Sequence, residues 1–526
     1  MTPGRGHNKG MTGTTPAITI AEKPKKDAAF AFLLYEKESP AEGLLWKFLS
    51  SAERHYLSSP AVARQLKLKE GDSKIFTLPG SGRRIVAVGL GARTEDMAKK
   101  VRTAAIAARI TVQAARRERI AHIACEARAA AAMPTAEAAG EICEIAATNM
   151  VMANFEYDAY KTTPAGGQRT VAEVQFIASK DIPAARRAAM GEGIRRGIVI
   201  GEETNACRIL QNTPGGDMTP EVLAKHAMDI ARRLGKAVKA AILGVPEMKK
   251  LGMGGVLGVG QGSAVSPRFI ILEYMAGRKA EAPTVLVGKG VTFDTGGLNL
   301  KPSEHIYEMH MDMSGGAAVI HALAAAVRNG VKKNIVALVP AVENMPSGSS
   351  YRPGDLLRTM NGKTIEVLNT DAEGRVILAD ALEYAKRYNP ALVVDVATLT
   401  GAAMVALGLR YTGLFTPSKE LEDRFRALGD AVADPVWPLP LSEGYVNDIR
   451  GTFADWANTA TRSGIGGGAS TAAAFLWQFT KDAKGRQEYP WVHLDIAPRM
   501  TSIEEEHLAK GGLGTPVRLL ARLLEE

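Results

Sequence analysis

Residues 364–388 read TIEVLNTDAEGRVILADALEYAKRY, in which an apolar run, a polar turn and a second apolar run follow one another directly. Thr364–Leu368 favours a buried strand, and Val376–Tyr388 has the apolar spacing of a helix. The turn carries Asp371 and Glu373, two carboxylates separated by one residue. A helix cap at Asp371 and a favourable charge at the helix N-terminus from Glu373 would account for both. The turn alone leaves this local interpretation and a functional one open.

The alternation of strand and helix continues on both sides of this stretch. Strands are expected over Ala237–Ile242, Arg268–Tyr274, Pro283–Gly288, Asn334–Pro340 and Ala391–Val396, and helices over Thr219–Leu234, Gly315–Arg328 and Gly401–Leu409. This alternation is typical of a largely parallel or mixed sheet with helices on both faces. Ligands of such sheets bind beyond the carboxyl ends of the strands, which is where the acidic residues of this chain collect.

A second, smaller set of elements precedes this part of the chain. Strands are expected over Ala28–Leu34, Arg84–Gly91 and Val171–Ala178, and helices over Ala98–Ala115 and Thr135–Ala147. Because 526 residues exceed the usual size of one hydrophobic core, we expect two α/β domains, a smaller N-terminal one and a larger C-terminal one with a mixed sheet flanked by helices. The predicted boundaries are a disordered leader at 1–16, the N-terminal domain at 17–181, a linker helix at 182–211 and the C-terminal domain at 212–526.

The composition excludes several classes of protein. A hydrophobic content of 46% and a charged content of 23% are typical of a globular chain, and no apolar run is long enough to cross a bilayer. The first residues lack the apolar segment of a signal peptide. The cysteines Cys125, Cys143 and Cys207 are odd in number and widely spaced, which fits a reducing compartment. A cytoplasmic location without a membrane partner is therefore expected.

The formal net charge of +9 raises the question of a nucleic-acid partner. Much of the excess lies in Arg and Lys residues interspersed along Ala-rich helical stretches such as Lys99–Arg119. A solvated helix face explains that pattern better, so a nucleic-acid partner is not favoured.

Two further loop passages carry charged residues like those of the first turn. KGVTFDTGGLNLKPS at 289–303 contains Lys289, Asp294 and Lys301, and MHMDMSGGAAV at 309–319 places Asp312 directly before a helix. Four carboxylates from three loops cannot share a cleft without positive charge between them, because buried anions repel and resist desolvation. Two divalent cations would neutralise them. Oxygen donors with at most one nitrogen suit zinc, manganese, magnesium or cobalt.

Lys289 needs a separate explanation, because an ammonium cannot coordinate a metal ion. Beside two dications its pKa would fall and the neutral amine could bind. The alternative is an ordinary ion pair with Asp294, which spacing does not exclude. A His-based metal site is weaker, since the chain has no H-E-x-x-H motif, and His305 and His310 are expected near the site rather than as ligands.

Several motifs together closely resemble the leucyl (cytosol) aminopeptidase family of two-metal exopeptidases. They are VGKGVTFDTGG at 287–297, MDMSGGAAV at 311–319, ENMPSGSSYRPGD at 343–355, NTDAEGR at 369–375 and DVATLTGA at 395–402. FADWAN at 453–458 and WVHLDIA at 491–497 extend the resemblance, which covers roughly residue 212 to the C-terminus. It continues more weakly into the N-terminal part.

The resemblance implies a role for each candidate residue. Lys301 and Arg375 would be the catalytic pair, with Lys301 stabilising the oxyanion and Arg375 holding a bicarbonate that serves as general base. Asp294 and Glu373 would bridge two metal ions that hold the attacking hydroxide. The full set of implied metal ligands is Lys289, Asp294, Asp312, Asp371 and Glu373. The residues implied or suggested to bind the substrate are Met309, Thr398, Leu399 and Gly401.

The function implied is that of a hydrolase, a metal-dependent aminopeptidase that releases leucine and other, mainly apolar, residues from peptides with a free N-terminus. Two zinc or manganese ions per subunit and a cytoplasmic homohexamer are implied with it. The alternative is a DNA-binding regulatory protein with secondary peptidase activity. A relative that has lost its metals is a third possibility, which the presence of all seven catalytic and metal-binding residues disfavours.

One Gly-rich stretch could be mistaken for a nucleotide loop. Gly252–Ser263, GMGGVLGVGQGS, lacks the strand-to-helix context and the downstream acidic residue of a dinucleotide site. We expect a tight structural loop there.

Overall fold

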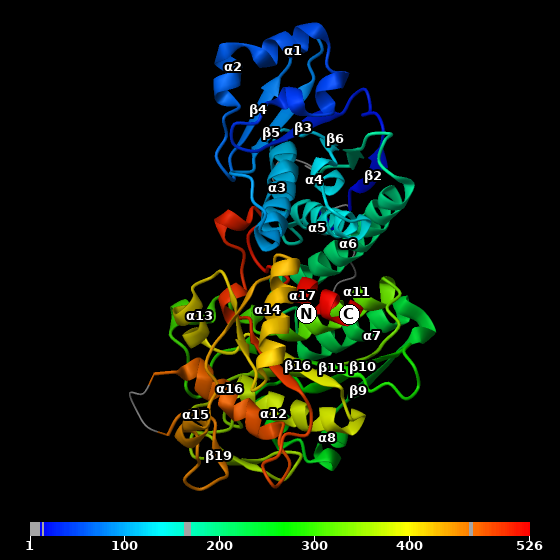
Figure 1. Ribbon diagram of the computed structural model, residues 1–526. Coiled ribbons are helices and arrows are strands. Elements are labelled where there is room, and N and C mark those ends of the chain that lie inside the picture. Colours follow the sequence, from blue (N-terminus) through cyan, green and yellow to red (C-terminus); the bar gives the residue numbers. More distant parts are fainter. Residues whose placement is uncertain (1–10, 13–14, 163–169, 462–465) are drawn as a thin grey trace. The chain divides into compact units, whose positions relative to one another are not determined.

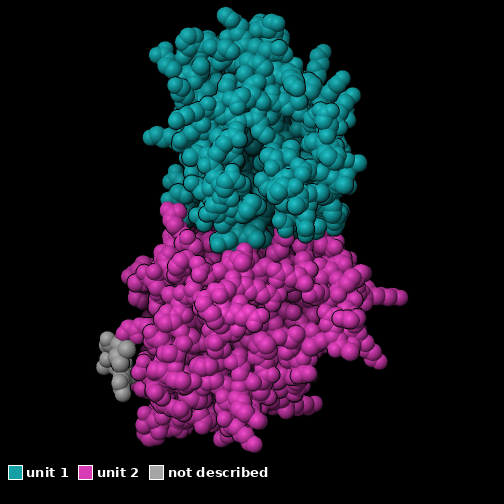
Figure 2. All heavy atoms as spheres, in the orientation of Figure 1, with its two compact units in different colours: residues 1–205, 430–433, 502–510 teal, residues 206–429, 434–501, 511–526 magenta. Residues whose placement is uncertain are grey.

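The computed structural model describes residues 11–12, 15–162, 170–461 and 466–526. The chain divides into two compact units, one of residues 1–205, 430–433 and 502–510 and one of residues 206–429, 434–501 and 511–526 (Figure 2). Both units contain a β-sheet with helices, so the predicted two-domain α/β class is confirmed. The expected leader falls mostly outside the described residues. Of it, β1 (Met11–Thr12) pairs with β7 (Glu156–Tyr157).

Unit 1 is built on a six-stranded sheet in the order β2-β8-β6-β3-β5-β4. Every pairing in it is parallel except that of β4 with β5. The long helices α3 and α5 pack against each other. The bounds are β2 (Ala17–Ala21), β3 (Ala29–Leu34), β4 (Ser73–Thr77), β5 (Arg84–Gly89), β6 (His122–Glu126), β8 (Glu173–Ile177), α1 (Ser51–Ser58), α2 (Pro60–Gln65), α3 (Met97–Arg117), α4 (Arg128–Ala131) and α5 (Ala136–Ala153).

A short C-terminal segment, Ser502–Lys510, belongs to unit 1 although nearly all of unit 2 separates it in sequence from residues 1–205 of that unit. Its contact is made through Arg109, a buried residue of α3 that forms an ion pair with the Glu506 carboxylate. The Arg109 guanidinium also donates to the Glu506 carbonyl oxygen at 3.0 Å. Helix α6 (Ala184–Asn212) contains the point at which the chain passes from unit 1 to unit 2.

Unit 2 is built on a nine-stranded mixed sheet, which confirms the predicted sheet type. Its order is β18-β17-β20-β16-β11-β13-β10-β9, and β12 pairs with β13. The central strands β20, β16, β11 and β13 are parallel, and antiparallel pairings lie toward both edges. The bounds are β9 (Val238–Leu243), β10 (Arg268–Met275), β11 (Thr284–Gly288), β12 (Gly290–Asp294), β13 (Asn334–Asn344), β16 (Leu392–Ala397), β17 (Thr412–Phe415), β18 (Val436–Pro438) and β20 (Trp491–Asp495).

Helices cover both faces of this sheet (Figure 1). Helices α7 and α11 pack on one face, whereas α9, α12 and α16 pack together against the other. The central strands are apolar throughout because both of their faces are covered. No helix of the described residues is long and apolar enough to span a bilayer. The bounds are α7 (Pro220–Leu234), α8 (Val245–Leu251), α9 (Gly254–Gly260), α10 (Ser303–Ile306), α11 (Ser314–Arg328), α12 (Glu373–Ala385), α13 (Gly401–Leu407), α14 (Lys419–Ala431), α15 (Glu443–Asp448), α16 (Gly468–Phe479) and α17 (Val517–Glu525).

The strand before the acidic turn does not belong to the main sheet, and this part of the sequence-based interpretation is wrong. β15 (Thr364–Glu366) pairs instead with β14 (Leu356–Arg358) and β19 (Trp456–Ala457) in a separate small sheet. The acidic turn reaches the carboxyl edge of the main sheet because α12 packs on that sheet and begins there. Helix α12 also starts at Glu373, three residues before the predicted position, so that Glu373 and Arg375 lie in its first turn.

Gly252–Ser263 is largely helical, in contrast to the predicted loop. Glycine is a poor helix former, but its lack of a side chain allows α9 to approach its neighbours closely. A Cβ atom on Gly255 would lie 2.5 Å from the carbonyl oxygen of Val376 on α12. The buried Asp380 of α12 accepts a hydrogen bond from the Val256 amide at 2.9 Å. Tight packing against α12 explains Gly255, whereas Gly252 ends α8 in a left-handed conformation that favours glycine.

We predict that Gly255→Ala destabilises unit 2 by about 1–3 kcal/mol, because the added methyl group forces α9 away from α12. Urea unfolding, compared with wild type, measures the change. Gly444→Ala on α15 is the matched control, since its Cβ would meet no atom closer than 3.5 Å. Equal unfolding free energies for the two variants would contradict this account of α9.

Candidate metal centre

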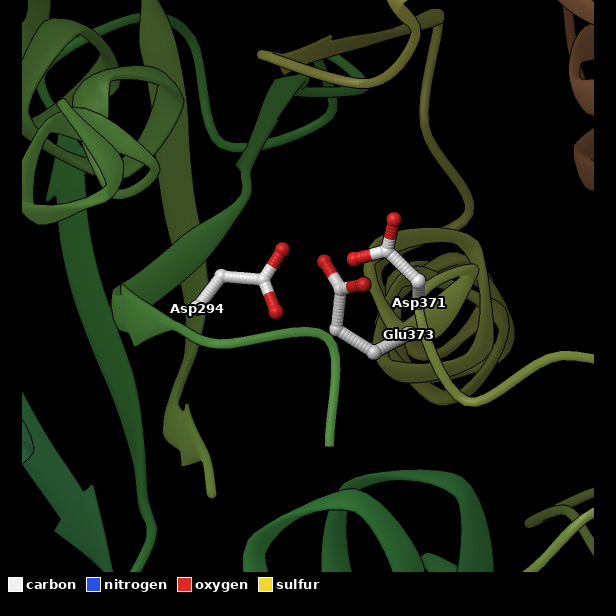
Figure 3. Close-up of side chains that lie close together, drawn as sticks. All are labelled: Asp294, Asp371 and Glu373. Carbon is white, nitrogen blue, oxygen red and sulfur yellow. The ribbon is translucent and has the colours of Figure 1, made fainter. Parts of the chain in front are cut away.

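The predicted metal ligands meet at the carboxyl edge of the unit 2 sheet. Lys289 directly follows β11, Asp294 ends β12, and Asp312 lies between the 3-10 helix Met309–Met311 and α11. Asp371 and Glu373 stand at the start of α12. Figure 3 shows the carboxylates of Asp294, Asp371 and Glu373 pointing toward one another. One oxygen of each of these three lies within 4.8 Å of the others.

Asp294 is held by two hydrogen bonds to one of its oxygens. The Gly296 amide donates to Oδ1 at 2.9 Å, and the Asn344 side-chain amide donates to the same atom at 2.8 Å. Asn344 ends β13 and also donates to the Thr370 carbonyl oxygen at 3.0 Å. It therefore fixes the Asp294 loop to the turn that carries Asp371. Sequence reasoning assigned no role to Asn344, although its motif was noted.

Two lysines neutralise part of this negative charge. The Lys289 ammonium lies 2.7 Å from Asp312 Oδ2 and 2.9 Å from Glu373 Oε1. Asp294 pairs with Lys301 at 2.9 Å, and Asp371 also pairs with Lys301. The alternative partner considered for Lys289 from the sequence, Asp294, is thus the ion-pair partner of Lys301 instead.

The two ammonium groups can balance only two of the four carboxylates when all four are ionised. Burial and the nearby Glu373 raise the pKa of Asp294 to about 6. Burial also raises the pKa of Asp312 well above its usual range, in spite of the Lys289 ammonium. The Glu373 Oε2 atom is buried and has no hydrogen-bond partner among the residues that the structure describes. This excess of clustered oxygen donors fits divalent cations.

The charge state of Lys289 depends on two opposing effects, burial and the neighbouring carboxylates. Burial alone lowers the pKa of Lys289, but the carboxylates of Asp312, Glu373 and Asp294 raise it above its ordinary value. The side chain is therefore an ammonium in this arrangement. Coordination of a metal ion through its nitrogen would release that proton.

The predicted substrate-binding residues line a cavity of about 300 Å³ beside the carboxylates. Met309, Thr398, Leu399 and Gly401 all contribute to its wall. Further lining residues are Lys301, Arg375, His305, Met404 and Met500. The structure therefore brings every predicted site residue to one place.

Asp495 is a positioning residue that sequence reasoning missed. Its Oδ1 atom accepts hydrogen bonds from the amides of Leu399 at 3.1 Å and Ala497 at 3.2 Å. Its Oδ2 atom accepts from the Thr400 hydroxyl at 2.6 Å. One carboxylate at the end of β20 thus holds two wall segments of the cavity. The signal available in the sequence was an acidic residue at the end of an apolar strand.

We predict that the chain binds two divalent ions and that Glu373→Gln weakens the binding of at least one of them by about tenfold or more. The reason is that the amide removes a negative charge from the centre of the cluster. Calorimetric titration with Mn²⁺ or Zn²⁺ measures the affinity and the number of ions. Glu383→Gln is the control, because Glu383 lies on the same helix but pairs with Lys386. Unchanged metal binding by Glu373→Gln would refute the assignment.

Comparison with known families gives matches in both units. The catalytic domain of the cytosol aminopeptidase family matches residues 205–521, and the N-terminal domain of the same family matches residues 31–164. Probable cytosol aminopeptidases from Syntrophotalea carbinolica and Roseiflexus castenholzii are 38% and 40% identical to this chain. These alignments cover 98% and 84% of this chain and 99% and 87% of the relatives.

Solved structures give the same result. A mutant of tomato leucine aminopeptidase has a TM-score of 0.82 and 29% identity, covering 98% of this chain and 97% of its own. The bottromycin maturation enzyme BotP in complex with Mn has a TM-score of 0.77 and 31% identity, covering 95% and 99%. The DNA-binding alternative gains no support from these relatives. The resemblance seen in the sequence is confirmed: this chain belongs to the cytosol aminopeptidase family, hydrolases that use metal ions to remove N-terminal residues from peptides.

Proposed function

We propose that this aminopeptidase releases leucine and other, mainly apolar, residues, and that it uses two zinc or manganese ions. The observation that carries the proposal is the position of the carboxylate cluster, which opens into a cavity with an apolar wall of Met309, Leu399, Met404 and Met500. Such a wall suits an apolar side chain next to the reacting peptide bond. The manganese complex of BotP supports manganese as one candidate.

The metal ligands of the proposal are the five residues of the cluster, Lys289, Asp294, Asp312, Asp371 and Glu373. Divalent ions bound there would polarise the scissile carbonyl, activate water and bind the free α-amine of the substrate. The chain's own contribution is to hold the carboxylates in place. Asn344 does so for Asp294, and the Thr398 hydroxyl donates to Asp312 Oδ1 at 2.7 Å.

Lys301 is the proposed electrophilic residue. Burial alone lowers its pKa, but Asp294, Glu373 and Asp371 raise it above the ordinary value, so the side chain keeps its charge at neutral pH. Its ammonium lies in the wall of the cavity. A fixed positive charge there stabilises the negative charge that develops on the carbonyl oxygen, an effect worth about 3 kcal/mol or more.

Arg375 is the proposed anchor for a small anion. Burial lowers its pKa to about 10, which still leaves the guanidinium protonated at neutral pH. Its Nη1 group donates to the Asn458 carbonyl oxygen at 2.7 Å. Its buried Nε has no hydrogen-bond partner among the described residues, so a donor remains for an anion. Bicarbonate bound there would accept the proton of the attacking water as general base.

Three parts of the proposal concern the state of the protein in the cell and rest on the family resemblance. They are the use of bicarbonate, assembly into a homohexamer and a cytoplasmic location. Sedimentation of the purified chain tests the assembly directly.

We predict that a panel of aminoacyl chromogenic substrates is hydrolysed fastest when the residue is leucine or another apolar residue. Chelation of divalent ions abolishes turnover, and adding back Mn²⁺ or Zn²⁺ restores it, because the carboxylates act through the ions. An N-acetylated substrate is the control and remains intact. A preference for acidic or basic residues would overturn the proposed specificity, while turnover after complete chelation would overturn the metal requirement.

We predict that Lys301→Ala lowers kcat by about 100-fold or more while both metal ions stay bound, because the ammonium that stabilises the developing charge is lost, whereas its partners Asp294 and Asp371 remain to hold the ions. Turnover and metal content are measured on the same sample. Lys363→Ala is the matched control, since Lys363 is a half-buried lysine that donates to the Gln478 carbonyl oxygen at 2.6 Å and does not line the cavity. Near-normal turnover of Lys301→Ala would remove its proposed role.

A further inference from the structure

Unit 1 contains a second cavity, of about 280 Å³, which the aminopeptidase reaction does not use. It lies at the carboxyl ends of the parallel strands β3, β5 and β6, where Leu34, Leu90 and Glu126 line it. From β3 the chain passes first to β4 and β5 on one side and then to β6 on the other. Parallel α/β sheets bind their ligands at this kind of switch point.

The inner wall of this cavity is apolar. Phe32 and Phe176 contribute from the strands, and Ile142 contributes from α5. Helix α3 contributes Ala104, Ala107 and Ala108, which share one helix face. These short side chains hold α3 against its neighbours but leave space between them. The wall suits an aliphatic or aromatic side chain and offers little to a fully polar ligand.

Charged side chains of both signs stand at the other end of the cavity. Arg93 and Arg128 line it there, and both pair with Glu38, at 3.1 Å for Arg93; the Glu38 side chain is 2% exposed and does not itself line the cavity. Arg128 lies 3.4 Å from Glu126. Arg93 is 66% exposed and covers the Tyr35 ring at 5.0 Å, so it can rotate toward a ligand at small cost.

The number of charges restricts the ligand. Of the charged residues that line the cavity, Lys100 pairs with Glu95 at 2.9 Å. The two arginines are balanced by Glu126 in the lining and by Glu38 outside it, so the cavity favours a ligand without net charge that carries a positive and a negative group together. In a zwitterion the negative group can pair with the arginines and the positive group with a glutamate, whereas a simple anion would be repelled by the glutamates.

We propose that this cavity of unit 1 binds a free apolar α-amino acid of leucine size. The carboxylate of the ligand meets the Arg93 and Arg128 guanidiniums, its ammonium meets the Glu126 carboxylate, and its side chain lies on the alanine face of α3. The binding itself needs only the groups of unit 1. The link to leucine as a released product rests on the proposed function of the catalytic cavity.

Calorimetric titration of the full, metal-loaded chain with L-leucine tests the site. Wild type is expected to bind leucine at a unit 1 site in addition to any product binding at the catalytic cavity. Ala107→Leu fills the space on α3 and is expected to remove one binding event per chain. Arg93→Gln is expected to weaken that event by about tenfold, as for loss of a charged hydrogen bond. Arg102→Gln, on the same helix but outside the cavity, is the control and leaves binding unchanged.

The unfolding midpoint of each variant shows whether it folds. If Ala107→Leu does not fold, the affinity of Arg93→Gln for leucine decides the test. Two analogues test the zwitterion requirement: 4-methylpentanoate, which lacks the amine, and isopentylamine, which lacks the carboxylate. Weaker binding of both, by about tenfold, supports the proposal. Identical leucine binding by wild type, Ala107→Leu and Arg93→Gln overturns it, as does equal affinity for 4-methylpentanoate. The panel of aminoacyl substrates tests the catalytic cavity alone, so the proposed specificity can fail while leucine binding in unit 1 is confirmed, and the reverse.

Discussion

The repulsion between four carboxylates in one buried volume is the constraint on which the catalytic unit depends. Asp294, Asp312, Asp371 and Glu373 come from three loops, and the loop with Asp371 and Glu373 lies far along the chain from the other two. They meet because the parallel strands end at one edge of the sheet and α12 begins at the same edge. Lys289 and Lys301 neutralise only half of the charge, so the surrounding scaffold must hold the carboxylates against their own repulsion until cations complete the balance.

The scaffold supplies that restraint through a few side chains that touch no reacting group. Asn344 connects the Asp294 loop to the Thr370 carbonyl oxygen, and Asp495 connects two walls of the cavity. Asp380 joins α9 to α12 from the middle of the same helix that begins with Glu373. All three are buried polar residues whose hydrogen bonds cross between segments distant in sequence. The metal ligands are thus held in position by residues from several parts of the unit that are not ligands themselves.

The sequence predicted those parts of the fold in which local pattern and tertiary environment agree. β11, β16 and α11 lie within one or two residues of their predicted ends, because buried strands and helices leave clear apolar patterns. The sheet to which β15 belongs could not be read from its own residues, since pairing depends on partners far along the chain. The helix at Gly255 was missed because low helix propensity was overcome by close packing. The proximity of the site residues was predicted through motifs, whereas Asn344 and Asp495 became visible only through their partners in space.

Unit 1 is not a continuous length of chain, and this affects how the protein is made. Its sheet and long helices are encoded before residue 206, yet Ser502–Lys510 is added after almost all of unit 2. During synthesis the Arg109 guanidinium cannot pair with Glu506 until about 300 residues of the second unit have been translated. The contact of Arg109 with Glu506 therefore forms only after residues 206–501 have been translated, so that unit 1 is completed after most of unit 2 has been made.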